Sequence, residues 1–232
     1  MSMLSRGPRG PRSTLLLASS TALFLSLPGV QAASAAEVLY ANVGPHYTIA
    51  CSQNFESTYD DSDSAAADDF AVPDAATWRV SEVDVLGHYF GYKHAGPAQS
   101  WHVTMYADAA GTPGAVVADY DGLPESPRND LAAPDGYKDT WVSIPVPETE
   151  LAAGRYWLSV VANLRSSRGQ DDTGGGEWAW VVFRDGQGRQ MQWQNPGDHF
   201  DTGCTAWAKY RKCWYGEGRD AVFKLKGELV GG

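Results

Sequence analysis

Residues 67–92 read A-D-D-F-A-V-P-D-A-A-T-W-R-V-S-E-V-D-V-L-G-H-Y-F-G-Y, and the second half of this stretch alternates between apolar and polar side chains. Trp78 and Val80 share one side, and Val83 and Val85 continue the apolar series one step out of phase. Alternation with a period of two is typical of a strand with one face in a core, and the change of phase predicts a β-bulge. We therefore expect a central strand here, preceded by a polar turn over residues 67–73.

Similar alternating runs occur along the rest of the chain, at residues 38–40, 47–51, 101–106, 116–120, 142–146, 154–164, 178–183 and 221–226. Asp185-Gly186 follows one of these runs directly and predicts a hairpin that returns through Met191 and Trp193. No helical pattern is present outside the first 35 residues. The sequence predicts an all-β fold, an antiparallel β-sandwich of 8 to 10 strands with a jelly-roll-like arrangement.

The first 35 residues have the features of an export signal. Arg6, Arg9 and Arg12 precede a short apolar run, and the small residues at positions 33–35 suit cleavage by a signal peptidase. The run is too short and too often interrupted by Ser and Thr to span a membrane. We expect residues 1–35 to be a signal peptide and residues 36–232 to form one β-sandwich domain of a secreted, extracellular protein.

The charge balance limits the classes of partner. Of the 18 Lys and Arg residues, three belong to the predicted signal, which leaves 15 against 28 Asp and Glu and a net charge of −13. Nucleic acid and anionic lipid both require a basic face, so neither is an expected partner. We also expect no membrane span and a monomeric protein.

Cysteine is scarce, with Cys51, Cys204 and Cys213 in the chain. In an oxidising compartment the two late cysteines are the favoured pair, because a bond between them closes a short ring. The alternative is a bond from Cys51 to one of them, and the sequence leaves this choice open.

Short motifs recur in a fixed order along the chain: A-D-D-F-x-V-P at 67–73, G-T-P-G at 111–114, G-R-Y-W-L-S at 154–159 and D-A-V-F-K-L-K-G at 220–227. In this order the chain resembles a broad group of exported bacterial β-sandwich domains. The resemblance implies a jelly-roll-like sandwich and no particular activity. The segment between Cys204 and Cys213 departs from the pattern of that group.

No catalytic motif is recognisable, and we expect the protein not to be an enzyme. Glu82 and Asp84 match the first two acids of the Glu-x-Asp-x-x-Glu pattern of β-glucanases, but Gly87 stands in place of the second Glu. These two acids are then expected to be the solvent-facing residues of a strand. His88, His94 and His102 lie near predicted strands and are an alternative site, for zinc.

A cluster of carboxylates provides a candidate metal site. The cluster lies in and after the polar segment 52–66, and its residues are Asp60, Asp61, Asp63, Asp68 and Asp69. Loops at the end of a sandwich can gather the six to eight oxygens that calcium takes. We expect no required cofactor, with bound calcium as an alternative to a solvated acidic loop.

The segment enclosed by Cys204 and Cys213 combines aromatic and cationic side chains in an otherwise acidic protein. Flat aromatic side chains stack on sugar rings, and a cross-linked loop lowers the ordering cost of binding. We expect a binding site here, formed by Trp207, Lys209, Tyr210, Arg211 and Trp214. The same aromatics could instead cover a sheet edge.

These observations favour a secreted non-catalytic module that binds a glycan or another extracellular or envelope component, including a protein. The alternatives are a structural or adhesive secreted protein, stabilised by calcium, and a secreted hydrolase with an unrecognised site.

Overall fold

The computed structural model describes residues 36–90, 97–126, 139–165, 176–214 and 217–230, and every structural statement below refers to these ranges. The predicted signal peptide lies outside them. In chain order the elements are β1 (Glu37–Asn42), β2 (Thr48–Cys51), β3 (Gln53–Asn54), η1 (Ser57–Ser62), β4 (Ala65–Phe90), β5 (Ser100–Asp108), β6 (Pro113–Leu123), β7 (Asp139–Asn163), β8 (Glu177–Phe183), β9 (Gln192–Gln194), β10 (Ala208–Lys209), α1 (Tyr210–Cys213), β11 (Asp220–Ala221) and β12 (Phe223–Leu229).

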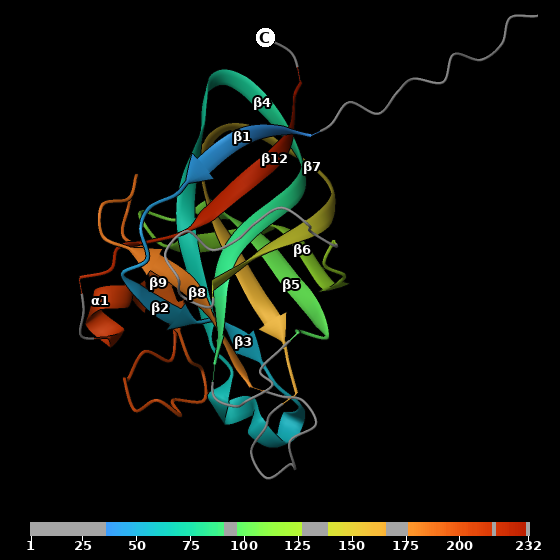
Figure 1. The fold of residues 1–232 in the computed structure, drawn as a ribbon. Coiled ribbons are helices and arrows are strands. Elements are labelled where there is room, and N and C mark those ends of the chain that lie inside the picture. The colour runs from blue at the N-terminus through green and yellow to red at the C-terminus, as the bar shows by residue number, and fades with distance from the viewer. Residues whose placement is uncertain (1–35, 91–96, 127–138, 166–175, 215–216, 231–232) are drawn as a thin grey trace, which may run out of the picture. The chain divides into compact units, whose positions relative to one another are not determined.

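The prediction of an all-β fold is confirmed, and β4 is its central strand. It covers 26 residues and appears in Figure 1 as one long band that bends back on itself. Its pairing with β7 skips one residue between Val80 and Glu82, and its pairing with β12 does the same. Ser81 is therefore the bulged residue, and the predicted bulge is confirmed.

The polar turn predicted over residues 67–73 is wrong, because Ala65–Val72 is also strand. The pairing with β7 breaks between Val72 and Thr77, where Ala75 adopts a φ of 64°. The chain changes direction at this break, a few residues later than the motif suggested. The reason is that Asp68 and Asp69 are buried residues of the strand rather than residues of a solvated turn.

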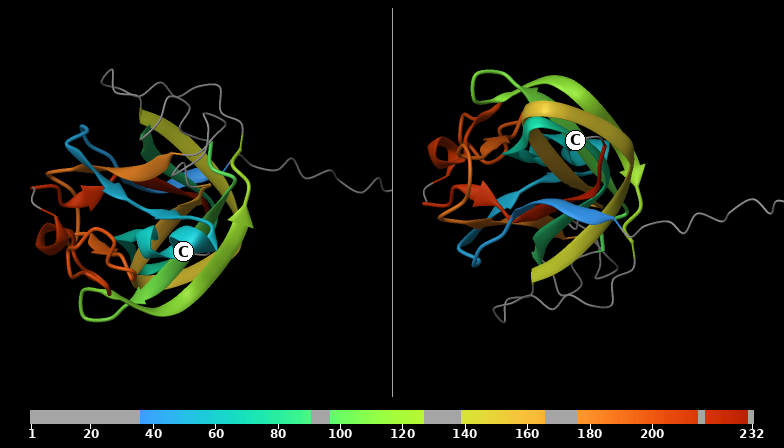
Figure 2. Two further views of the ribbon diagram at one scale, coloured as in Figure 1. Left: turned by 90° about the horizontal axis from the view of Figure 1, so that it is seen from below. Right: turned by 90° about the horizontal axis from the view of Figure 1, so that it is seen from above.

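The break in β4 divides the strands between two sheets of a sandwich. In the first sheet, residues 65–72 of β4 lie between β9 and the second half of β7, which is followed by β5 and β6. In the second sheet, residues 77–90 lie between the first half of β7 and the strands β12 and β8, and β1 flanks β12. Both β4 and β7 belong to both sheets. Figure 2 shows β5 and β6 (green) along the outer side of the first sheet.

Large aromatic side chains fill the space between the sheets. Trp101 of β5 meets Trp178 of β8 edge to face, with ring centroids 5.0 Å apart, and Phe70 stacks on Trp78 across the bend of β4. Trp178 lies so close to Gly87 that a Cβ on that residue would be 2.1 Å from the indole nitrogen. The glycine that interrupts the glucanase-like pattern is therefore required by the packing of the core.

The expectation that Glu82 and Asp84 face solvent is wrong for Asp84, which is fully buried. Lys226 of the neighbouring strand β12 covers both acids, with its Nζ 2.6 Å from Glu82 Oε1 and 2.8 Å from Asp84 Oδ2. A cation from the adjacent strand thus compensates the two carboxylates.

The hairpin predicted at Asp185-Gly186 is also wrong. β8 pairs with β2, β4 and β11, whereas β9 pairs with β4 and β10. The segment 184–191 therefore passes from the second sheet to the first instead of returning along β8.

Among the described residues, no helix is long and apolar enough to cross a membrane.

Candidate functional site

A disulfide joins Cys204 to Cys213, with 5.8 Å between the Cα atoms. The favoured pairing is thereby confirmed, and Cys51 is a free thiol whose burial raises its pKa to about 12. Within the ring, β10 pairs with β9 and so attaches the ring to the edge of the first sheet. The ring is attached to the sheet through β10, and residues 205, 206, 211 and 212 are exposed.

Tyr210 is not placed to contact a ligand, contrary to expectation. Its ring is buried, and its hydroxyl donates to the carbonyl oxygen of Ile49 at 2.8 Å. Burial raises the pKa of Tyr210 to about 12. Trp214 is half-buried and packs edge to face on Trp193 and Phe200. These two aromatics hold the ring on the domain.

The other three predicted residues remain accessible. Lys209 and Arg211 are exposed, and Trp207 is partly exposed. Trp207 packs against Tyr106 of β5, with ring centroids 6.0 Å apart and an interplanar angle of 75°. The disulfide-closed ring thus places an indole beside an aromatic side chain of the first sheet.

Tyr106 ends a row of polar side chains on the outer face of β5. Residues 100–107 pair with β7 without a register break, so alternate residues share one face. Trp101, Val103 and Met105 belong to the core, which places Ser100, His102, Thr104 and Tyr106 on the opposite face. The four residue steps from His102 to Tyr106 make this row about 13 Å long.

Carboxylates from β6 join the row at its exposed side. Asp119 Oδ1 lies 2.7 Å from His102 Nε2 and accepts a hydrogen bond from the Thr104 hydroxyl at 2.8 Å. These two hydrogen bonds lower the pKa of Asp119. Asp121 accepts a hydrogen bond from Asn163 Nδ2 of β7, which lowers its pKa as well. The result is an ordered set of donors and acceptors next to the aromatic pair.

The five predicted metal ligands do not come together. Asp60 and Asp61 belong to η1, and Asp63 accepts a hydrogen bond from the Phe55 amide at 2.8 Å. Asp68 and Asp69 are buried in β4. Among the described residues, no group of three or more His, Cys, Asp or Glu side chains is arranged to hold a metal ion.

The histidines of the zinc alternative are likewise apart. His88 lies against Asp139, with Nδ1 2.9 Å from Oδ1, and His102 lies against Asp119 in the polar row. His94 is outside the described residues.

Asp68 and Asp69 have structural partners instead. Asp68 accepts hydrogen bonds from Asn42 Nδ2 at 3.1 Å and from the Ala221 amide at 2.7 Å. Asp69 accepts from the Arg189 amide at 2.6 Å and pairs with Arg155 of β7. The A-D-D-F motif therefore joins β4 to β1, β11 and the segment 184–191.

Two glycines let that segment approach the carboxylates closely. A Cβ on Gly186 would lie 1.8 Å from Asp220 Oδ2, and one on Gly188 would lie 2.5 Å from Asp69 Oδ1. Gly188 also has a φ of +94°, in the region that favours glycine. The Asp185-Gly186 pair that suggested a hairpin instead allows the backbone of residues 184–191 to pack closely against the buried carboxylate of Asp220.

The sequence pointed to the ring but not to its partner on the sheet. The alternation of residues 101–106 places His102, Thr104 and Tyr106 on one outward face, and this signal was available. The contact between Tyr106 and Trp207 joins positions 101 residues apart and has no local signature.

No protein-family model matches the chain, and no curated protein or solved structure matches it either.

Loss of the disulfide should weaken the fold. Replacing both Cys204 and Cys213 with Ala should lower the free energy of unfolding by about 2.5 kcal/mol, because the unfolded chain regains the entropy of the open loop. Urea unfolding with and without reductant measures this. Reductant should destabilise the parent protein to the same extent and leave the double variant unchanged. An equal effect of reductant on both proteins would contradict the prediction.

Proposed function

We propose that this protein is a secreted, non-catalytic module that binds a glycan on the outer face of β5 and β6, beside the disulfide-closed ring. The contact between Trp207 and Tyr106 carries the proposal, since it places two partly exposed aromatic rings at the end of an ordered polar row. Tyr106 replaces Tyr210 as the second aromatic of the site.

The chemistry of the row suits a sugar. Aromatic faces pack against the apolar side of a pyranose ring, and carboxylates and imidazoles form hydrogen bonds with its hydroxyl groups. His102 and Asp119 already bond to each other and to Thr104, so their side chains are oriented before a ligand arrives. Thr104 in the middle of the row is buried, whereas His102 and Tyr106 are partly exposed. These two residues are about 13 Å apart along the strand, so they can contact different sugar units.

The ring supplies rigidity and charge. The disulfide and the buried Tyr210 fix the backbone on either side of Trp207, which lowers the entropy lost on binding. Lys209 is exposed on β10 and adds a cation at the edge of the same sheet. A surface of this kind serves recognition at the cell envelope or in the extracellular medium.

A glycan array followed by calorimetry on residues 36–232 tests the proposal. The Trp207→Ala and Tyr106→Ala variants should each weaken binding of the selected glycan by at least about tenfold, because each removes a central aromatic contact. Trp207→Phe should retain most of the affinity, since it keeps an aromatic face.

Trp141→Ala is the matched control. Trp141 is also partly exposed, and it packs under Lys224 on β12, away from the polar row. This variant should bind as the parent protein does, and all variants should keep the parent unfolding cooperativity. An array without any hit, or an equal loss in Trp141→Ala, would refute the glycan site. The remaining functions are then a structural or adhesive role, or a hydrolase, which glycan turnover would reveal.

A further inference from the structure

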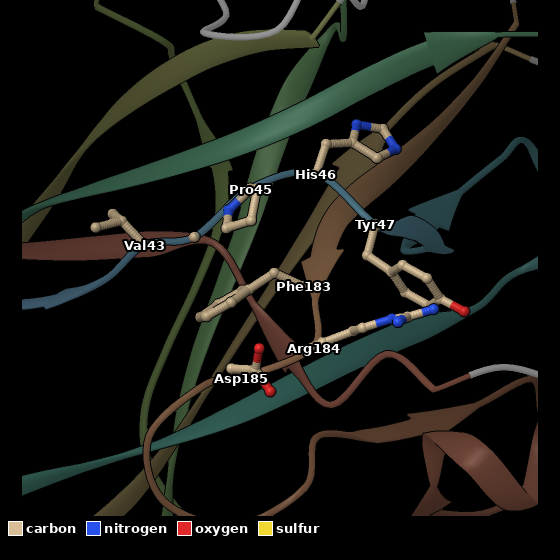
Figure 3. Close-up of a pocket in the computed structure, with 8 residues that line it drawn as sticks. Val43, Pro45, His46, Tyr47, Phe183, Arg184 and Asp185 are labelled. Atoms are coloured by element: carbon tan, nitrogen blue, oxygen red, sulfur yellow. The ribbon is translucent and has the colours of Figure 1, made fainter.

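A cavity of about 300 Å³ lies on the second sheet, at the junction of two chain segments. Residues 43–47, between β1 and β2, form one wall, and Phe183, Arg184 and Asp185 at the end of β8 form the other. Figure 3 shows Pro45 and Phe183 facing each other across it. Its volume is at the lower end of the range for small-molecule sites.

The two segments are shaped to meet here. The Tyr47 amide donates to the carbonyl oxygen of Val182 at 3.0 Å, which ties the first segment to β8. A Cβ on Gly44 would lie 2.1 Å from the ring of Phe183, so glycine allows the backbone to lie against that ring. The side chains of Val43, Pro45 and Phe183 then form an apolar wall, and Val43 stays 52% exposed.

The charged groups at the cavity differ in how they are compensated. The Arg184 guanidinium lies 3.9 Å above the ring of Tyr47, as Figure 3 shows, and pairs with Glu217 at 3.2 Å. Asp185 is exposed at the other side of Phe183. The hydrogen bond to Tyr47 and then the charges of Glu217 and Asp185 raise the pKa of Arg184, so Asp185 also acts on this cation. Asp185 is thus the acidic group of the cavity lining, in a protein whose net charge is −10.

We propose that this cavity binds a small organic cation, an ammonium group on an apolar or aromatic body. The ammonium group pairs with Asp185, and the apolar body packs against Val43 and Pro45, the exposed apolar side chains of the wall. The negative net charge raises the local concentration of such cations. Free amines and the lysine side chain of another chain share this chemistry. The site has no residue in common with the proposed glycan site.

Chemical-shift titrations of the Gly44 and Arg184 amides with four probes test this proposal. Benzylamine should bind more tightly than benzyl alcohol, and benzoate should bind most weakly, because the charge must match Asp185. Asp185→Asn should weaken benzylamine at least about tenfold and benzyl alcohol less than about twofold. Asp74→Asn, at another exposed acid, should change neither.

The fourth probe distinguishes the sources of the ammonium group. N-acetyl-lysine methylamide that binds as tightly as benzylamine assigns the cavity to a lysine side chain, and weaker binding assigns it to free amines. Equal binding of benzoate and benzylamine would overturn the proposal, as would benzylamine affinity that Asp185→Asn leaves unchanged. Absence of shifts with every probe would overturn it as well.

Discussion

The free energy of unfolding should fall by on the order of 3 kcal/mol as the pH rises from about 4 to about 8. The cause is the set of buried carboxylates beneath the segment 184–191. Asp68 and Asp69 are fully buried, and Asp220 is 3% exposed. Burial raises the pKa of all three, and the neighbouring negative charges raise the pKa of Asp68 and Asp220 further.

The sign follows from proton binding. Burial and the charge of Asp69 raise the pKa of Asp220 from 3.8 to about 7, so between these values the folded protein holds a proton that the unfolded chain has lost. Folding is then favoured at the acidic end of the window, and its stability is lost as the pH rises through the folded pKa. Asp63, whose burial raises its pKa to about 6, changes stability in the same direction.

Urea unfolding at several pH values between 4 and 8 measures this slope. Asp220→Asn should flatten it, since the side chain that holds the proton is replaced by a neutral one. Asp74→Asn removes an exposed acid and should leave the slope unchanged. A stability that rises between pH 5 and pH 8 in the parent protein would contradict the argument.

Arg155→Ala should destabilise the protein by about 3 kcal/mol at pH 7. Arg155 of β7 forms an ion pair with Asp69, whose side chain is fully buried. Removing the cation leaves a buried carboxylate with no opposite charge of comparable proximity, and this costs far more than the loss of an exposed pair. The destabilisation should become smaller as the pH falls, because burial raises the pKa of Asp69 and protonation removes the uncompensated charge.

Arg79→Ala is the matched control. Arg79 pairs with Glu150 and Glu228, whose side chains are 59% and 60% exposed, so its loss should cost less than about 1 kcal/mol. In the double variant Arg155→Ala/Asp69→Asn most of the stability should return, because the uncompensated charge is gone. If both arginine variants lost the same free energy of unfolding, the prediction that the buried ion pair contributes more to stability than the exposed one would be wrong.

Local patterns carried the prediction of the fold. The alternation of Trp78, Val80, Val83 and Val85 predicts a strand with one face in the core. The break in that alternation predicts a bulge between Val80 and Val83, and the structure places it at Ser81. Both follow from the geometry of a single strand, so the neighbouring residues contain the information. The Cys204–Cys213 pairing was favoured for a similar reason, since the two cysteines are close in the chain.

Features that depend on distant partners were missed. Asp68 and Asp69 look like turn residues because their compensating groups, Asn42 and Arg155, lie on other strands. Asp185-Gly186 looks like a hairpin because nothing nearby shows that Asp220 lies beneath Gly186. Tyr210 looks like an exposed ligand contact because its neighbours in the sequence give no sign of burial. Its hydroxyl donates to the carbonyl oxygen of Ile49, which lies on β2, 161 residues earlier in the chain.

The position of β12 also has a consequence for the order of folding. This strand, Phe223–Leu229, lies between β1 and the second half of β4. Both of these earlier segments therefore form hydrogen bonds with a strand that is far away in the sequence. Until residues 223–229 are available, Val83 and Val85 have no partner on that side and β1 cannot join the sheet. Pairing across such a separation is slow. In a chain that is still being synthesised, β1 and residues 78–85 of β4 therefore lack their shared partner until β12 has emerged.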